Sequence, residues 1–304
     1  MTVLYSRAVI AHARMTHLAC ALAAGLAVLS TPVFAAASAK PAQREPGTIR
    51  TIVLDPGHGG EEVGAVGHTG VFEKDLCLDI AQRLRDRLAR LPDTTVLLTR
   101  EDDRVVPLRE RTAIANHAKA DLFVSIHMNS SRRLSAHGTE AYFLALTASD
   151  EEAMTLAHAE NALPSPLPGS DGNPGQPADP NAANAAAADA SQNDLDLVLW
   201  GMAQSEHIVS SSRLADVVQD EMNRLLKVDS RGVKQAPFTV LMGATMPAVL
   251  VEVAFLSNEA EEKLLITGEF KDKVADALQS AIVRFKDETE KALSTVPTLD
   301  GHNP

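Results

Sequence analysis

Short apolar runs alternate along the chain with longer stretches in which apolar residues recur every three or four positions. The short runs predict buried strands, and the longer stretches predict helices with one apolar face. We expect strands at 48–55, 94–100, 120–129, 138–145 and 247–257, and helices at 73–91, 107–118 and 259–288. This alternation is typical of an α/β fold, so we predict a single domain with a twisted, mostly parallel sheet covered by helices on both faces.

Residues 163–193 interrupt this pattern. They are rich in Pro, Gly, Ala, Asn and Asp and hold few large apolar side chains, which is typical of a flexible loop. Helical patterns flank this loop at 149–161 and 195–209, and Ser149 with Glu152 forms a candidate capping box for the first. We therefore expect a helical insertion at about 147–208, inside a domain that extends from 50 to 289.

The two ends of the chain differ from this domain in composition. Arg7 and Arg14 precede a short apolar run followed by Pro32 and small residues, which is typical of a secretory signal peptide. A membrane anchor is the alternative, but the run is too short to span a membrane comfortably. We expect an exported protein that does not span the membrane, with a signal peptide at 1–35, a linker at 36–49 and a disordered tail at 290–304.

Polar side chains lie at or near the carboxyl ends of several predicted strands. His58 follows the first strand in "DPGHGG", His127 ends "LFVSIH", and Glu252 lies near the end of "AVLVEVAF". Glu73 opens the helix after the first strand. Ligands of open α/β sheets bind at this edge, so these side chains could converge. Two histidines and a carboxylate form a familiar catalytic zinc set, and another carboxylate can act as general base.

Each of these residues also has a simpler interpretation. A lone histidine is usually a surface or core residue, and Glu73 could be an acid that the dipole of its helix favours. Glu252 in an apolar strand would be costly to bury without a partner. The glycines around His58 allow a tight turn and leave room for a metal and a bulky substrate.

Several blocks of the sequence together point to one family. "TIVLDPGHGG…EKDLCLDIAQRL", "LFVSIHMNS" and "RGVKQAPFTVLMGATMPAVLVEVAFLSN" resemble the zinc-dependent N-acetylmuramoyl-L-alanine amidases of bacterial cell walls, over about 50–285. The resemblance implies that His58, Glu73 and His127 bind one Zn²⁺ and that Glu252 is catalytic. It implies hydrolysis of the amide bond between N-acetylmuramic acid and L-alanine in peptidoglycan, in the periplasm, commonly for daughter-cell separation. One departure is "EVGA" after His58, where the family usually has Asp-Pro-Gly-Ala; it lies outside the implied ligands.

The resemblance extends to regulated Gram-negative members, which carry a similar insertion and are switched on by an activator with a degenerate metallopeptidase domain. In those members the glutamate of a Glu-Asn pair occupies the open zinc position, which implies that Glu160 is an autoinhibitory ligand. A solvated helix residue is the alternative. Leu197 and Trp200 lie off the apolar face of the helix at 195–209, and we expect them to contact the activator or to pack into the domain.

Other classes of protein fit less well. A serine hydrolase needs a G-x-S-x-G turn, and a phosphate-binding loop needs a Lys-Ser/Thr pair after its glycines; neither motif is present. A non-catalytic peptidoglycan-binding module would have no need of all four candidate metal and base residues, and another metallohydrolase is the remaining alternative. The formal net charge of −12 argues against nucleic acid as a partner.

Overall fold

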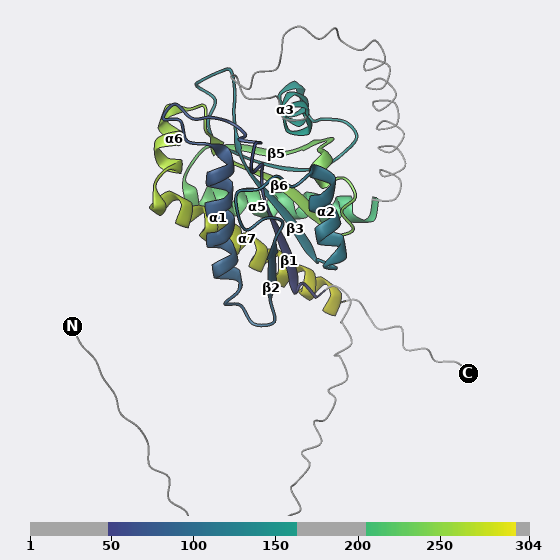
Figure 1. Ribbon diagram of the computed structural model, residues 1–304. Helices are drawn as coiled ribbons and strands as arrows, with labels where there is room; N and C mark the ends of the chain where they lie inside the picture. The colour runs from purple at the N-terminus through teal and green to yellow at the C-terminus, as the bar shows by residue number, and fades with distance from the viewer. Residues whose placement is uncertain (1–47, 163–204, 296–304) are drawn as a thin grey trace, which may run out of the picture. The chain divides into compact units, whose positions relative to one another are not determined.

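β1 (Thr51–Pro56) leads into the glycine-rich stretch and lies second in a six-stranded sheet of order β2-β1-β3-β6-β4-β5. The computed structural model describes residues 48–162 and 205–295 (Figure 1). The other strands are β2 (Thr95–Leu98), β3 (Leu122–Asn129), β4 (Thr139–Leu144), β5 (Ser230–Ala236) and β6 (Ala248–Phe255). The helices are α1 (Glu73–Leu88), α2 (Leu108–His117), α3 (Glu151–Asn161), α5 (Ser205–Leu226), α6 (Glu259–Leu265) and α7 (Gly268–Ser294), with a 3-10 turn, η1 (Thr239–Leu241).

The sheet is mostly parallel, as the alternation of strands and helices predicts. β2, β1, β3 and β6 run parallel to one another, whereas β4 is antiparallel to β6 and parallel to β5. β3 and β6 are buried at every position, because helices cover both faces of the sheet. α1, α5 and α7 contribute to the core on one face, and α2, α3 and η1 to the core on the other.

Side chains alternate between these two faces along each strand. On β3, Val124 and Ile126 belong to the core beneath α1, α5 and α7, whereas Phe123 belongs to the opposite core. Ser125 and His127 therefore point toward α2 and α3. The same alternation on β6 directs Glu252 to this side, because Val251 and Val253 face the other. The α2–α3 face thus carries Ser125, His127 and Glu252.

The structure also corrects parts of the sequence prediction. β5 was not predicted, because its sequence SRGVKQA contains no apolar run. α5 extends far beyond the helix expected at 195–209, whose residues before 205 lie outside the described ranges. The expected capping box of Ser149 and Glu152 is wrong. Asp150 caps α3 instead, because its carboxylate accepts a hydrogen bond of 2.7 Å from the backbone N–H of Ala153.

Other expectations concern the ends of the chain and the insertion. The structure does not describe residues 1–47, 163–204 or 296–304, so the signal peptide and the loop at 163–193 lie outside it. α7 continues to Ser294, past the expected domain boundary at 289. Within the described residues, no helix is both long and apolar enough to cross a membrane.

Candidate metal centre

The His58 loop begins where β1 ends and is held by two buried arginines. His58 has a φ of 57°, in the left-handed region that a non-glycine residue adopts only under constraint. Arg100 donates to the carbonyl oxygens of Pro56 (3.1 Å) and Gly57 (2.7 Å). Arg111 donates to those of Pro56 (2.8 Å) and His58 (2.9 Å). These charge-assisted hydrogen bonds stabilise the strained turn and fix the imidazole that follows it.

Two glycines in this region make room for the candidate ligands themselves. A Cβ atom on Gly57 would lie 2.5 Å from the imidazole of His127. At Gly64, where φ is +69°, a Cβ atom would lie 2.5 Å from Oε2 of Glu73 and 2.6 Å from the ring of His58. The sequence prediction assigned the space to metal and substrate, whereas the structure shows that ligand side chains fill part of it.

His58, Glu73, His127 and Glu160 converge on one point, with one potential ligand atom from each lying within 4.8 Å of the others. Oε1 of Glu73 is 3.1 Å from both His58 Nε2 and His127 Nδ1. Oε2 of Glu160 is 3.4 Å from His58 Nε2 and 3.1 Å from His127 Nδ1. Tetrahedral zinc with ligands at about 2.0–2.2 Å separates those ligands by roughly 3.4 Å. The spacing therefore suits one zinc ion.

Two further observations support a cation at this point. His58 Nε2 is buried and has no hydrogen-bond partner among the described residues, although it lies close to both carboxylates. Burial lowers the pKa of His127, but Glu160 and Glu73 outweigh this effect, so that the pKa is raised well above its usual range. The surroundings thus favour a positive charge, which a metal ion would supply.

Glu73 is fixed by backbone hydrogen bonds as well as by its place at the start of α1. Its Oε1 accepts from the N–H of Met128 (3.0 Å), and its Oε2 accepts from the N–H of Ala65 (2.8 Å). Burial raises the pKa of Glu73, but the charge of His58 and the other contacts hold it well below its usual range. Glu73 is therefore an ionised and oriented carboxylate, as a metal ligand requires.

Glu252 lies directly beside this cluster. It is the register partner of His127 on β3 and of Glu140 on β4, and it is fully buried. Neither of its carboxylate oxygens has a hydrogen-bond partner among the described residues. Burial raises the pKa of Glu252 well above its usual range, although His127 acts in the opposite direction. A carboxyl group with a raised pKa is a better proton acceptor than an ordinary glutamate, as a general base requires.

Glu160 reaches the cluster from the last turn of α3, which lies next to β5 at the top of Figure 1. The next residue, Asn161, anchors this end of the helix. Its Nδ2 donates to the carbonyl oxygen of Pro237 (2.8 Å), and its Oδ1 accepts from the N–H of Thr239 (2.7 Å). Asn161 thus holds α3 in the position that brings Glu160 to the two histidines.

Comparison with known proteins identifies the family. The family model described as N-acetylmuramoyl-L-alanine amidase matches residues 52–284. This chain belongs to the N-acetylmuramoyl-L-alanine amidase family. It is 34% identical to the amidase AmiC of Escherichia coli O6:H1 in an alignment of 235 residues, which covers 77% of this chain and 52% of AmiC. It is 33% identical to AmiA of Escherichia coli K12 in an alignment of 247 residues, which covers 81% of this chain and 79% of AmiA. The chain thus spans about half the length of AmiC.

Solved amidase structures share the fold. An N-acetylmuramoyl-L-alanine amidase from Clostridium difficile 630 superimposes with a TM-score of 0.56 at 26% identity, covering 79% of this chain and 98% of that one. The catalytic domain of the amidase CwlV from Bacillus (Paenibacillus) polymyxa gives a TM-score of 0.56 at 27% identity, covering 79% and 99%. The predicted α/β fold is confirmed.

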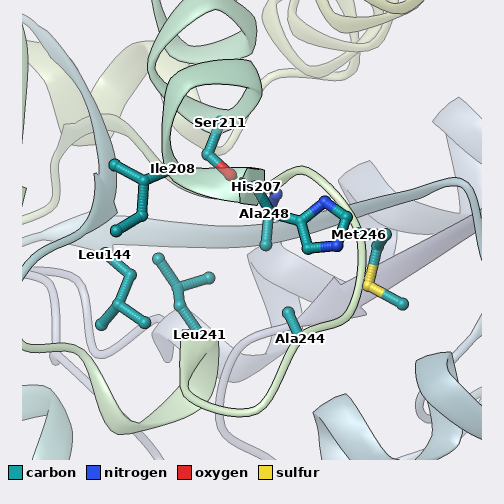
Figure 2. Close-up of a pocket in the computed structure, with 8 residues that line it drawn as sticks. All are labelled: Leu144, His207, Ile208, Ser211, Leu241, Ala244, Met246 and Ala248. Carbon is teal, nitrogen blue, oxygen red and sulfur yellow. Dashed lines mark hydrogen bonds between the residues drawn. The ribbon is translucent and has the colours of Figure 1, made fainter. Parts of the chain in front are cut away.

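A small pocket in this family member is lined by residues outside the cluster. Figure 2 shows its lining, which is mostly apolar and includes Leu144 at the end of β4 and Ala248 at the start of β6. Ser211 of α5 accepts a hydrogen bond of 3.0 Å from the N–H of Ala248, which joins the helix to the strand. None of the lining residues belongs to the metal-ligand group, so we assign this pocket no role in the chemistry.

The site residues expected from the sequence divide into two sets. His58, Glu73, His127, Glu160 and Glu252 come together, whereas Leu197 and Trp200 lie outside the described residues. Sequence reasoning did not identify Arg100 and Arg111. Arg100 comes shortly after β2 and Arg111 lies within α2, and the sequence pattern of neither element is unusual. The partners of both arginines are mostly backbone carbonyls, which cannot be recognised in a sequence.

Proposed function

We propose that this amidase family member hydrolyses the bond between N-acetylmuramic acid and L-alanine in peptidoglycan and depends on one zinc ion. The proposal rests on the convergence of four ligand-type side chains beside the buried carboxyl group of Glu252, whose oxygens have no hydrogen-bond partner among the residues that the structure describes. The family match supports the choice of bond, because the relatives are named for this activity.

In this proposal His58, Glu73 and His127 hold the zinc ion. When bound, zinc supplies a Lewis acid that polarises the scissile carbonyl and makes a nearby water more acidic. Glu252 accepts the proton of the attacking water. It then returns a proton to the amine of L-alanine as the amide bond breaks. The products are a glycan with a free lactyl carboxylate and a peptide with a free amino terminus.

We further propose that Glu160 keeps the enzyme inactive. A zinc ion with four protein ligands is a closed site that has no position for water or substrate. Oε2 of Glu160 lies 3.4 Å and 3.1 Å from the two histidine nitrogen atoms that Glu73 also approaches. These are the separations expected between ligands of one zinc ion, which supports this role. Activity then requires α3 to move away, and a partner that prefers the open state is sufficient to cause this.

The setting of the reaction follows from the family resemblance. We propose export to the periplasm after cleavage of the signal peptide at 1–35, and a role in daughter-cell separation. Activation would come from a protein with a degenerate metallopeptidase domain that contacts Leu197 and Trp200 in the insertion at about 147–208. The linker expected at 36–49 precedes the proposed catalytic domain, which begins at 50 and extends past the boundary expected at 289, because α7 continues to Ser294.

Digestion of purified peptidoglycan with identification of the products tests the proposed reaction. The full chain with Glu160→Ala should release peptides that begin with L-alanine and leave intact glycan strands. The same protein with Glu252→Gln added should release none. Sedimentation with peptidoglycan but no products would favour the wall-binding alternative, and cleavage at another bond would favour a different metallohydrolase.

A further inference from the structure

A row of polar side chains crosses the sheet from the metal centre toward β5. His127 on β3, Glu252 on β6 and Glu140 on β4 are successive register partners. Lys234 on β5 faces the same side, because its register partner on β4 is Tyr142, which belongs to the core beneath α3. The row therefore begins at a candidate metal ligand and ends at a cation.

The buried carboxylate of Glu140 holds two cations at the far end of this row. Its Oε1 accepts from Arg231 Nε (2.7 Å) and Lys234 Nζ (2.9 Å). Its Oε2 accepts from Asn129 Nδ2 (2.7 Å) and the Tyr142 hydroxyl (2.8 Å). One carboxylate thus balances two cations, and the surplus positive charge favours another anion beside them.

α3 supplies anions at this place in the present structure. The carboxylate of Asp150 lies 3.2 Å from Nζ of Lys234, and the carboxylate of Glu152 contacts the guanidinium of Arg231. Both acids stand at the start of α3, and Glu160 stands at its end. One helix therefore covers both ends of the row, the candidate metal ligands and the pair of cations.

We propose that Arg231 and Lys234 bind a carboxylate of the peptide stem of peptidoglycan, and that Asp150 and Glu152 occupy its place while α3 covers the site. This inference rests on the proposed function, because substrate can reach the two cations only when α3 leaves. The distance is measured from β6, because Glu252, the proposed general base, lies on this strand. Neighbouring strands lie about 4.8 Å apart, so β5 is roughly 10 Å from β6 across β4. An extended peptide spans about 3.4 Å per residue, which places this carboxylate on about the third residue of the stem.

The alternative is that the two cations serve only to attach α3 to the sheet. Arg133 provides a matched control for this role. It also contacts Glu152, at 3.3 Å, but its side chain is 70% exposed. Within the described part of the chain, it is not among the hydrogen-bond or ion-pair partners of Glu140. Loss of Arg133 should loosen the helix without changing the recognition of substrate.

The test uses the full, zinc-loaded chain with Glu160→Ala and two soluble N-acetylmuramoyl tripeptides. One tripeptide ends in a free carboxylate and the other in a carboxamide. We expect a KM about tenfold lower for the carboxylate, as one charge-assisted hydrogen-bonded contact provides. Adding Arg231→Gln should remove this preference by raising the KM for the carboxylate form with little change in kcat. Adding Arg133→Gln should leave the preference intact.

Equal KM values for the two tripeptides in the Glu160→Ala protein would overturn the inference, and this comparison does not depend on whether an Arg231 variant folds. A folded Arg231→Gln protein that keeps the full preference would also overturn it. Failure to cleave either tripeptide would overturn the proposed function, and this inference with it. Cleavage of both with equal KM would overturn the carboxylate site alone.

Discussion

His127 on β3 and Glu252 on β6 are register partners on adjacent parallel strands, and both side chains point to the face that α3 covers. The pairing is part of the sheet and does not depend on the position of α3. A candidate metal ligand and the proposed general base thus stay side by side whether Glu160 is present or withdrawn. The groups proposed to perform the chemistry thus lie on the sheet, whereas the group proposed to control access to it lies on α3.

The first prediction distinguishes these neighbours. His127→Ala should lose both zinc and activity, because a ligand is removed. Glu252→Gln should keep about one zinc per chain yet lose activity by about 10²–10⁴-fold, the usual contribution of a general base. Metal analysis and peptidoglycan hydrolysis, both in the Glu160→Ala background, measure the two effects. Normal turnover by the Glu252→Gln protein would contradict the assignment.

The second prediction concerns the anchor of α3. Asn161→Ala removes two hydrogen bonds that hold the end of the helix, while Glu160 remains. With about 1 kcal/mol for each bond, the open population and the basal hydrolysis should rise about 5–30-fold. The exposed His158 on the same helix is the control, and His158→Ala should change neither the open population nor the basal hydrolysis. An Asn161→Ala protein with wild-type basal activity would show that these bonds do not hold the inhibited state.

The third prediction concerns the buried pair beneath the His58 loop. Arg111 Nη1 lies 2.9 Å from Asp55 Oδ1, and both side chains are almost fully buried. Arg111→Met should lower the free energy of unfolding by about 3–5 kcal/mol, because it leaves Asp55 as a buried charge without its partner. It should also weaken zinc binding, since the carbonyl of His58 loses its donor. Urea unfolding and zinc titration measure the two effects.

The exposed Arg109 on the same helix is the control for that prediction, and Arg109→Met should change neither quantity appreciably. Zinc affinity equal to that of the wild type in a folded Arg111→Met protein would show that the arginine supports the fold without positioning His58.

The fourth prediction is a pH dependence of stability. Burial raises the pKa of Asp55, but Arg111 and the hydroxyls of Thr99 and Ser125 outweigh it and hold the pKa below the ordinary value of 3.8. A lowered pKa in the folded state contributes stability above the unfolded-state value, and this contribution is lost as the pH falls through the folded value. The difference in unfolding free energy between wild type and Asp55→Asn should therefore shrink below about pH 4. A difference that stays constant down to pH 2 would contradict this.

The central strands were predictable because apolar runs such as those of β1, β3 and β6 are buried on both faces. The rule that ligands gather at the carboxyl ends of parallel strands correctly brought His58, His127 and Glu252 together. β5 was not predicted because its sequence has no apolar run. Its charged residues Arg231 and Lys234 instead pair with the buried carboxylate of Glu140.

The supporting residues of the site were not predictable in the same way. Arg100 and Arg111 act on backbone carbonyls of the His58 loop, and such contacts depend on how distant segments meet. The approach of Glu160 to the histidines was expected only from the family resemblance, because an acid near the end of an Ala-rich helix has no distinctive pattern. A single sequence thus indicates strand-end chemistry better than the contacts that support or block it.

The most direct test of the account is the zinc content and basal activity of the full chain with Glu160→Ala, measured without any partner protein. We expect about one zinc per chain, held by the three remaining ligands, and faster hydrolysis of purified peptidoglycan than by the wild type, abolished by a chelator. Glu151→Ala, at the exposed start of the same helix, should behave as the wild type. Normal zinc content with basal hydrolysis no faster than that of the wild type would contradict the account.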